Sequence, residues 1–285
     1  AGMGIAFHAN TFPTKKPHIS YSEVRTWKEC PYRHKLTYVD KIEADSPSQY
    51  LDYGILLHEC LENYLQTREL DIDKLKSDLT AAWEEKGYDT EEYISLLTEQ
   101  AEARGEKPRI LEPLPDWLKW AETSISAIPE FMDTNFPNWK CISAEHQLYE
   151  NVKADDIKFK GFIDAVIECD YRKSKRKVWI LDWKTAPAYG WHSRKRQDFL
   201  VQAQIALYKK FWRDKFKYEC SDVGAGFVLL KRGAKKNFVD LFKVSVGPKT
   251  EEKAEKMVRS MLKSVRAGLY LKNRNSCKFC LFFVN

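Results

Sequence analysis

The sequence predicts an α/β protein in which helices flank a central mixed sheet and a helical region precedes it. Three observations predict this class. Short apolar and β-branched runs recur between residues 139 and 246, whereas residues 19–138 show helical spacing. One long helical pattern separates the third run from the fourth, an order that is typical of an α/β core. The hydrophobic content of 44% and the aromatic content of 13% are those of an ordinary globular core.

We divide the 285 residues into three parts. Residues 1–18 hold an extension whose start, A-G-M-G, resembles a cloning remnant; residues 19–138 form the helical region, and residues 139–285 form the core. This length allows one large domain or two small ones. Neither a run of 18 apolar residues nor a secretory signal occurs, so we expect a cytoplasmic protein without membrane contact.

An opening helical segment is expected over residues 19–42. Ser20 or Ser22 can cap it, and Pro31 interrupts its apolar stripe. The segment is therefore predicted to be broken near its middle.

Three further helices are expected before the core. Residues 51–70 form an amphipathic helix with His58 near the apolar face, where a histidine is more often a core residue than a ligand. Residues 71–103 form an acidic insertion, with eight acids against two bases between residues 84 and 106. Such a surface would repel DNA and help to confine it to the other side. Residues 116–135 form the last of the three.

The core is predicted to contain five strands and two helices. The strands are expected at residues 141–150, 158–169, 178–185, 223–231 and 239–246. The helices are expected at residues 199–216 and 250–271.

The chain is organised around V-W-I-L-D-W-K-T, residues 178–185. Asp182 and Lys184 are two positions apart, so on a strand they point to the same face. Asp164 lies within the preceding apolar run, where a charge is costly unless it is paired or bound to a metal. If the two runs pair as a hairpin, Asp164, Asp182 and Lys184 meet at one site. Two carboxylates beside a lysine suit Mg²⁺ or Mn²⁺.

Five short motifs resemble those of the PD-(D/E)XK nuclease superfamily, and of its RecB-like exonuclease branch in particular. They are C-P-Y-R near the start, G-I-L-L-H in the helix with His58, and then G-F-I-D, I-L-D-W-K-T and Q-A-Q-I-A-L-Y. Each motif alone is weak, but together they follow the family's order and spacing over residues 19–280. The resemblance implies a restriction-endonuclease-like core, similar to CRISPR-adaptation and AddB-type nuclease domains.

The resemblance also implies a metal centre. Asp164 and Asp182 are the expected ligands, joined by the Trp183 carbonyl and by His58. In the family the matching histidine helps to bind the metal, so the resemblance favours His58 as a ligand over a core residue. Glu145 stands where this superfamily often places another acid. It is a group that supports the ligands, a residue that touches a second metal, or an ordinary exposed strand residue.

Lys184 is expected near the scissile phosphate. It would orient or deprotonate the attacking water, or neutralise charge that grows on the phosphate oxygens, and the sequence does not separate these roles. By resemblance, Gln204 and Tyr208 contact the DNA strand near the active site, from one face of a helix. Gln202 is the alternative glutamine, and Tyr208 is alternatively a core residue.

The formal net charge of +6 is unevenly distributed. Between residues 171 and 196 nine Lys or Arg accompany one acid, which indicates where a polyanion would lie, although a solvated lysine-rich turn is the alternative. Aromatic residues in this stretch favour DNA, because they can stack on unpaired bases: Trp179, Trp183, Tyr189 and Trp191. The basic residues expected to contact DNA are Arg194, Lys195 and Arg196.

Seven cysteines without secretory context favour reduced thiols or a metal site over disulfides. Some RecB-like nucleases hold a [4Fe-4S] cluster with one cysteine near C-P-Y-R and three near the C-terminus, and Cys30, Cys277 and Cys280 match three of these ligands. The sequence ends at Asn285, about where a fourth would be expected, and His34 is an alternative donor. The other four are expected to be packing residues: Cys60, Cys141, Cys169 and Cys220.

These features predict a metal-dependent DNA exonuclease that acts on DNA ends or single strands in recombination, repair or phage DNA processing. One alternative is a structure-specific endonuclease. Another is a DNA-binding subunit without activity, whose signature would be loss of the acids or the lysine. Asp164, Asp182 and Lys184 are all present, which favours the enzyme.

Overall fold

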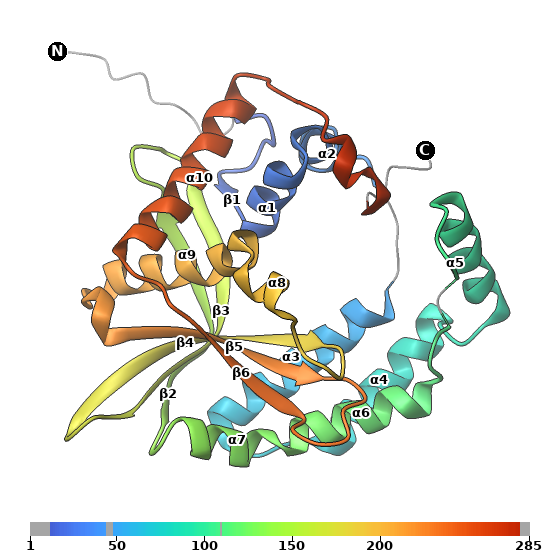
Figure 1. Ribbon diagram of the computed structural model, residues 1–285, viewed down its shortest axis with the longest axis horizontal. Coiled ribbons are helices and arrows are strands. Elements are labelled where there is room, and N and C mark those ends of the chain that lie inside the picture. The colour runs from blue at the N-terminus through green and yellow to red at the C-terminus, as the bar shows by residue number, and fades with distance from the viewer. Residues whose placement is uncertain (1–11, 44–47, 109, 280–285) are drawn as a thin grey trace.

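A six-stranded mixed sheet forms the middle of the molecule, with helices on both of its faces (Figure 1). The computed structural model describes residues 12–43, 48–108 and 110–279. The strand order is β1-β3-β4-β5-β6, and β2 pairs with β3 off this path. The strands are β1 His18–Ile19, β2 Lys140–Asn151, β3 Lys158–Tyr171, β4 Lys175–Ala186, β5 Val223–Lys231 and β6 Val239–Val244.

Two layers of helices share their apolar side chains with the sheet. One apolar cluster joins α1, α9 and α10 to one face, and a second joins α3, α4, α6 and α7 to the other. The helices are α1 Tyr21–Glu29, α2 Pro31–His34, the π-helical η2 Lys35–Val39, α3 Gln49–Thr67, α4 Ile72–Lys86, α5 Glu91–Ala103, α6 Leu114–Ser126, α7 Ile128–Asn135, α8 Ser193–Gln197, α9 Phe199–Phe216, η3 Cys220–Asp222, α10 Pro248–Arg266 and η4 Arg274–Phe279. Within the described ranges, no helix is both long and apolar enough to cross a bilayer.

The centre of the sheet combines one antiparallel and one parallel pairing. β3 and β4 form the predicted hairpin, with Ala165 opposite Leu181. β4 then pairs in parallel with β5 through a connection that contains α8 and α9, as a parallel pair requires. Every residue of β5 is buried, which is typical of a parallel strand covered on both faces. The predicted α/β class with a mixed sheet is confirmed.

One side of β3 changes its partner along the strand. β1 pairs with it at Lys158 and Phe159, and β4 pairs with it from Ala165 onward, while β2 occupies the other side throughout. Residues 160–164 therefore lie in a gap between β1 and β4. Asp164 stands at the end of this gap, where the sheet opens.

The opening segment begins and breaks as expected. Ser20 caps α1: its Oγ accepts the Glu23 N–H at 3.3 Å, and the Glu23 carboxylate accepts the Ser20 N–H at 3.2 Å. Pro31 then occupies the first turn of α2, where its missing N–H costs no hydrogen bond.

Several predicted boundaries differ from the structure. Gly87, with φ of +64°, ends α4, so the acidic region is two helices and not one. Pro129 lies in the first turn of α7 and separates it from α6. The closing helix ends at Arg266, shortly before Gly268 with φ of +69°. β1 and α8 were not predicted, because two and five residues are too short for a periodic signal.

Candidate active site

The hairpin of β3 and β4 brings two buried carboxylates together. Asp164 is 9% exposed and Asp182 is 4% exposed. The Trp183 N–H donates to Asp164 Oδ2 at 2.8 Å, which fixes the first carboxylate against the strand that carries the second. Lys184 Nζ lies 2.9 Å from Asp182 Oδ2. The structure therefore brings Asp164, Asp182 and Lys184 into one cluster.

Helix α3 adds His58 to this cluster. The His58 Nδ1–H donates to the carbonyl of Gly54, one turn earlier, at 2.6 Å. His58 Nε2 consequently faces the carboxylates and lies 3.2 Å from Asp164 Oδ2. A backbone acceptor that orients one ring nitrogen is the usual arrangement around histidines that bind metals.

The two adjacent carboxylates differ in ionisation. Burial and the charge of Asp182 raise the pKa of Asp164 to about 8. Burial acts in the same direction on Asp182, but the charge of Lys184 and the hydrogen bond with Asp164 outweigh it and lower the pKa of Asp182. Burial lowers the pKa of His58, whereas the contact with Asp164 raises it, in total to about 9. The elevated pKa of His58 depends on a charged Asp164, so this pair holds one shared proton.

Lys184 is an ammonium in this arrangement. Burial lowers its pKa, but the charges of Asp182 and Asp164 outweigh burial and raise it. The side chain remains 35% exposed, so its charged end reaches solvent. A charged ammonium can orient water and neutralise phosphate, whereas a base needs the neutral amine. The geometry favours the first two roles over deprotonation of water.

Glu145 has an unusual backbone for a strand residue. Its φ is +50°, in a region that residues other than glycine rarely adopt. The flanking pairs of the β2–β3 ladder place it across from Asp164. Burial, and then the charge of Glu62 on α3, raise the pKa of Glu145. Glu145 is exposed beside the cluster, and Glu62 is a neighbour that the sequence did not indicate.

A cleft of about 570 Å³ lies over the cluster and includes His58, Glu145 and Lys184 in its lining. The start of α3 supplies an exposed apolar wall that consists of Tyr50, Leu51 and Ile55. This wall was not predicted, because the apolar residues of the helix were all assigned to one face toward the core. The signal was present: Leu51 and Ile55 are four residues apart on a different side of the helix from the buried Tyr53 and Leu57, whereas Tyr50 lies on the same side as these two and packs on Trp117.

Tyr208 and Gln204 lie beside a smaller cavity of about 260 Å³, next to the gap in β3. The Gln204 Nε2–H donates to Tyr208 Oη at 3.4 Å. The ring of Tyr208 is buried over Gly161, where an added Cβ would lie 2.8 Å from Tyr208 Cε1. Gln202 instead donates to the carbonyl of Arg196 at 2.6 Å. Gln204 is thus the glutamine that faces the cavity, and the ring of Tyr208 is also part of the core.

The basic residues of α8 have different surroundings. Burial, and then the charges of Arg25 and Lys184, lower the pKa of Lys195, so this lysine lies within electrostatic range of Lys184. Arg196 Nε donates to the carbonyl of Trp191 at 2.8 Å, and Arg194 is exposed. Arg25 of α1 is close enough to act electrostatically on both Lys184 and Lys195, and it also pairs with Glu29 at 3.0 Å. The sequence did not single it out, because an isolated arginine in a helix gives no pattern.

Two of the four aromatic residues in the basic stretch are buried, so a nucleobase cannot stack on them. Trp183 is 1% exposed and Trp191 is 6% exposed, so the prediction that they stack on unpaired bases is wrong. Trp183 alternates with Asp182 along β4 and therefore packs into the apolar cluster on the opposite face. Tyr189 is exposed and Trp179 is half-buried.

The segment that follows α10 returns to Cys30 at the start of α2. The Asn273 N–H donates to Cys30 Sγ at 3.4 Å, and the Tyr32 N–H donates to the carbonyl of Leu271 at 3.1 Å. Burial raises the pKa of the Cys30 thiol, but backbone N–H groups, first that of Asn273, outweigh burial and lower it. Cys277 Sγ lies 3.9 Å from the Asn273 carbonyl, and Cys280 lies outside the described residues.

The other cysteines and His34 are not directed at this segment. Cys60 and Cys169 are buried, and Cys141 and Cys220 are half-buried. His34 is fully buried, and its Nε2 lies 3.5 Å from Glu23 Oε1. It is therefore not placed as a donor to Cys30.

The donors around His58 suit a divalent cation. Among residues 12–43, 48–108 and 110–279, no three His, Cys, Asp or Glu side chains form a ready-made metal cage. Asp164 and His58 instead contact each other, while Asp182 Oδ2 is buried and receives no hydrogen bond, although Lys184 lies close to it. Two carboxylates and an oriented imidazole fit a divalent cation once the shared proton leaves.

Comparisons with known proteins agree with this geometry at the level of the family. The family described as the PD-(D/E)XK nuclease superfamily matches residues 18–283. A crystal structure of a candidate exonuclease from Eubacterium rectale is 13% identical, with a TM-score of 0.49, and the match covers 96% of this chain and 91% of that one. The crystal structure of SSO0001 is 16% identical, with a TM-score of 0.35, over 81% and 93% of the two chains. No curated protein matches.

Proposed function

We propose that this chain, which belongs to the PD-(D/E)XK nuclease superfamily, is a metal-dependent DNA exonuclease of the RecB-like type. The pair of buried carboxylates, Asp164 and Asp182, carries the proposal. Two acids so close together are unstable without a proton or a cation between them. The lysine on the same face, Lys184, is the third member of the family's motif.

Asp164, Asp182 and His58 would hold Mg²⁺ or Mn²⁺, with the Trp183 carbonyl as a further donor. When bound, such an ion polarises the phosphate and makes the attacking water more acidic. Lys184 orients that water or neutralises charge on the phosphate oxygens. Glu145 supports the ligands from the neighbouring strand β2, where it lies opposite Asp164.

The cleft suits a single strand or the end of a duplex. Its exposed apolar wall at Tyr50, Leu51 and Ile55 can contact sugars and unpaired bases. Lys195 and Arg25 supply positive charge near the cluster for the phosphate backbone. These features support activity on DNA ends or single strands. By the resemblance to RecB-like nucleases, we place this activity in recombination, repair or phage DNA processing.

A time course on end-labelled and circular DNA, with Mg²⁺ and with Mn²⁺, tests the proposal. We expect stepwise release of short products from linear DNA and no attack on circular duplex DNA. Cleavage of circular single-stranded or branched DNA would favour the structure-specific endonuclease. DNA binding without any cleavage, at wild-type folding stability, would favour the inactive subunit.

We further propose that Cys30, Cys277 and Cys280 bind a [4Fe-4S] cluster. The N–H groups directed at Cys30 Sγ, and the return of the segment before Cys277, support this assignment, because hydrogen bonds to sulfur are typical of cluster ligands. Anaerobically purified protein is expected to be brown and to contain iron, and Cys30→Ala to lose both. Colourless anaerobic protein without iron or zinc would leave the three cysteines as packing residues.

A further inference from the structure

A third cavity lies where β4 and β5 begin, away from the catalytic cleft. It has a volume of about 620 Å³, within the range of small-ligand sites. Strand β4, helix α9, strand β5, strand β6 and the start of α10 all contribute to its lining. Three lysines from three elements reach it, and we call it the lysine pocket: Lys177 of β4, Lys209 of α9 and Lys243 of β6.

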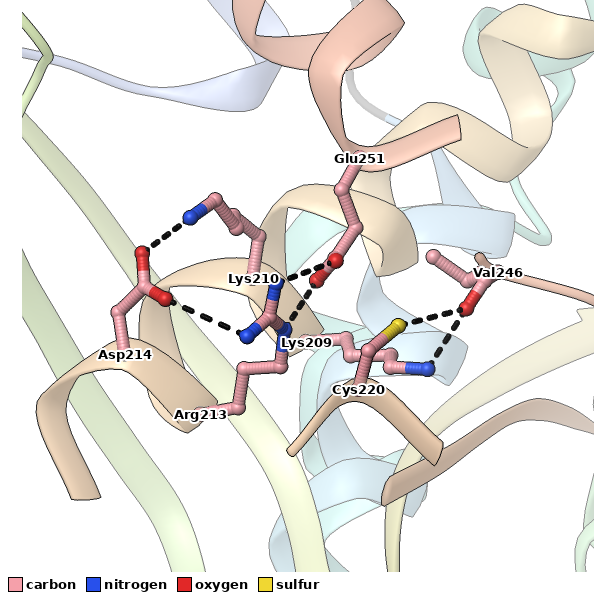
Figure 2. A network of polar contacts seen from close by, with 7 residues as sticks. All are labelled: Lys209, Lys210, Arg213, Asp214, Cys220, Val246 and Glu251. Carbon is pink, nitrogen blue, oxygen red and sulfur yellow. Dashed lines mark hydrogen bonds and ion pairs between the residues drawn. The ribbon is translucent and has the colours of Figure 1, made fainter. Parts of the chain in front are cut away.

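The three ammonium groups lack carboxylate partners. Within the described part of the chain, no ion pair involves any of them, and Glu219, the one acid of the lining, does not pair with them. Neighbouring charges on α9 are paired: Lys210 Nζ lies 2.5 Å from Asp214 Oδ2, and Arg213 binds Glu251 (Figure 2). The positive charge of the pocket is therefore left without a counter-ion.

Lys209 forms part of a fixed wall. Its side chain is 3% exposed, and Nζ donates to the carbonyl of Val246 at 2.7 Å, where Cys220 Sγ also donates at 3.5 Å (Figure 2). Burial lowers the pKa of Lys209, as expected for a buried charge held by a neutral acceptor. Two hydrogen bonds of 2.7 Å between Arg213 and Glu251 hold the first turn of α10 against α9.

The other two lysines converge on one ring. Lys177 Nζ lies 5.1 Å and Lys243 Nζ lies 5.3 Å from the centre of the Trp179 ring. The ring is held against the backbone of Gly224, where an added Cβ would lie 2.6 Å from Trp179 Cε3. The start of α10 at Gly247, which has no side-chain cap, adds the positive end of a 19-residue helix.

We propose that the lysine pocket binds a backbone phosphate of a nucleic-acid strand, at a place distinct from the catalytic cleft. The inference rests on the proposed nuclease function for its choice of a strand over a free anion. Trp179 precedes Asp182 by three residues, so the two side chains leave opposite faces of β4 roughly 10 Å apart along the strand. The pocket therefore cannot hold the phosphate that is cut. It binds a different backbone phosphate of the same nucleic-acid strand.

The test removes the two accessible lysines and leaves Lys209, whose loss would disturb the wall. Lys177→Gln/Lys243→Gln is compared with Lys86→Gln/Lys119→Gln, which removes the same charge from exposed positions on α4 and α6. Binding of fluorescent oligo(dT) is measured over a salt series without divalent metal. Each neutralised phosphate of a single strand contributes about 0.7 to the slope of log affinity against log salt, so loss of the one phosphate in the pocket should reduce the slope by about 0.7.

The control pair should leave the slope unchanged. An unchanged slope for the first pair, or an equal reduction for both pairs, overturns the proposal. If the lysines affect binding of inorganic phosphate but not that of oligo(dT), the pocket serves a free anion and the strand assignment is wrong. Hydrolysis of bis-p-nitrophenyl phosphate, which needs only the catalytic cleft, should be equal in all variants. If the wild type does not hydrolyse this compound, the nuclease proposal is wrong. The salt dependence of oligo(dT) binding can still be interpreted in that case, because it does not depend on catalysis.

Discussion

Binding of Mn²⁺ should weaken as the pH falls, because the metal must displace the proton shared by Asp164 and His58. The pKa of Asp164 is about 8 in the protein, so below pH 8 the proton is bound and each unit of pH lowers the apparent affinity about tenfold. Between pH 8 and pH 6 the affinity should fall by about two orders of magnitude. Between pH 8 and pH 9 the proton of His58, whose pKa is about 9, still competes with the metal, so the dependence should level off only above pH 9.

Isothermal titration of Mn²⁺ at several pH values, in two buffers of different ionisation enthalpy, measures both the affinity and the protons released. We expect about one proton per metal ion near pH 6. Glu84→Gln, on the exposed surface of α4, is a control that removes an acid and should leave the curve unchanged. An affinity that varies less than about threefold between pH 6 and pH 8 would refute the shared proton.

Three further predictions concern single residues. Asp182→Asn should lower cleavage at least about a thousandfold while the protein stays folded, because a metal ligand is lost without a change of volume; cleavage within tenfold of wild type would refute the assignment. Lys184→Met should lower kcat about a hundredfold or more and leave Mn²⁺ affinity within a few-fold, whereas calorimetry showing lost affinity would reassign the lysine to metal binding. Gly161→Ala should destabilise the protein by about 1–3 kcal/mol, because the added Cβ would lie 2.8 Å from the Tyr208 ring. Gly54→Ala should instead stabilise α3 by up to about 1 kcal/mol, because no atom lies within 4 Å of its added Cβ. Thermal melts that rank the two variants in the opposite order would contradict the packing.

Local patterns predicted much of the arrangement around the carboxylates. Asp182 and Lys184 share a face because strand alternation is a property of the backbone, and the short link to β3 made the hairpin expected. The same alternation places Trp183 on the opposite face, so its burial followed from the rule that was applied to its neighbours.

Other parts of the site depend on contacts that no local pattern encodes. Arg25 and Lys195 come from α1 and α8, and only the packing of these helices brings them near Lys184. Glu145 leaves the regular strand at a positive φ, which alternation does not anticipate. The apolar wall with Ile55 was missed because helical periodicity marks apolar positions without showing whether a helix or a cleft lies against them.

The contact between the two ends of the described chain has a consequence for synthesis on the ribosome. Tyr21 and Val24 of α1 share an apolar cluster with α10, and Tyr32 pairs with the carbonyl of Leu271. These N-terminal residues emerge first, yet their partners are among the last to be translated. The opening helices therefore lack their native contacts with α10 and Leu271 until translation has passed Leu271, and a nascent chain stalled within α10 should expose them to proteases that cannot reach them in the completed fold.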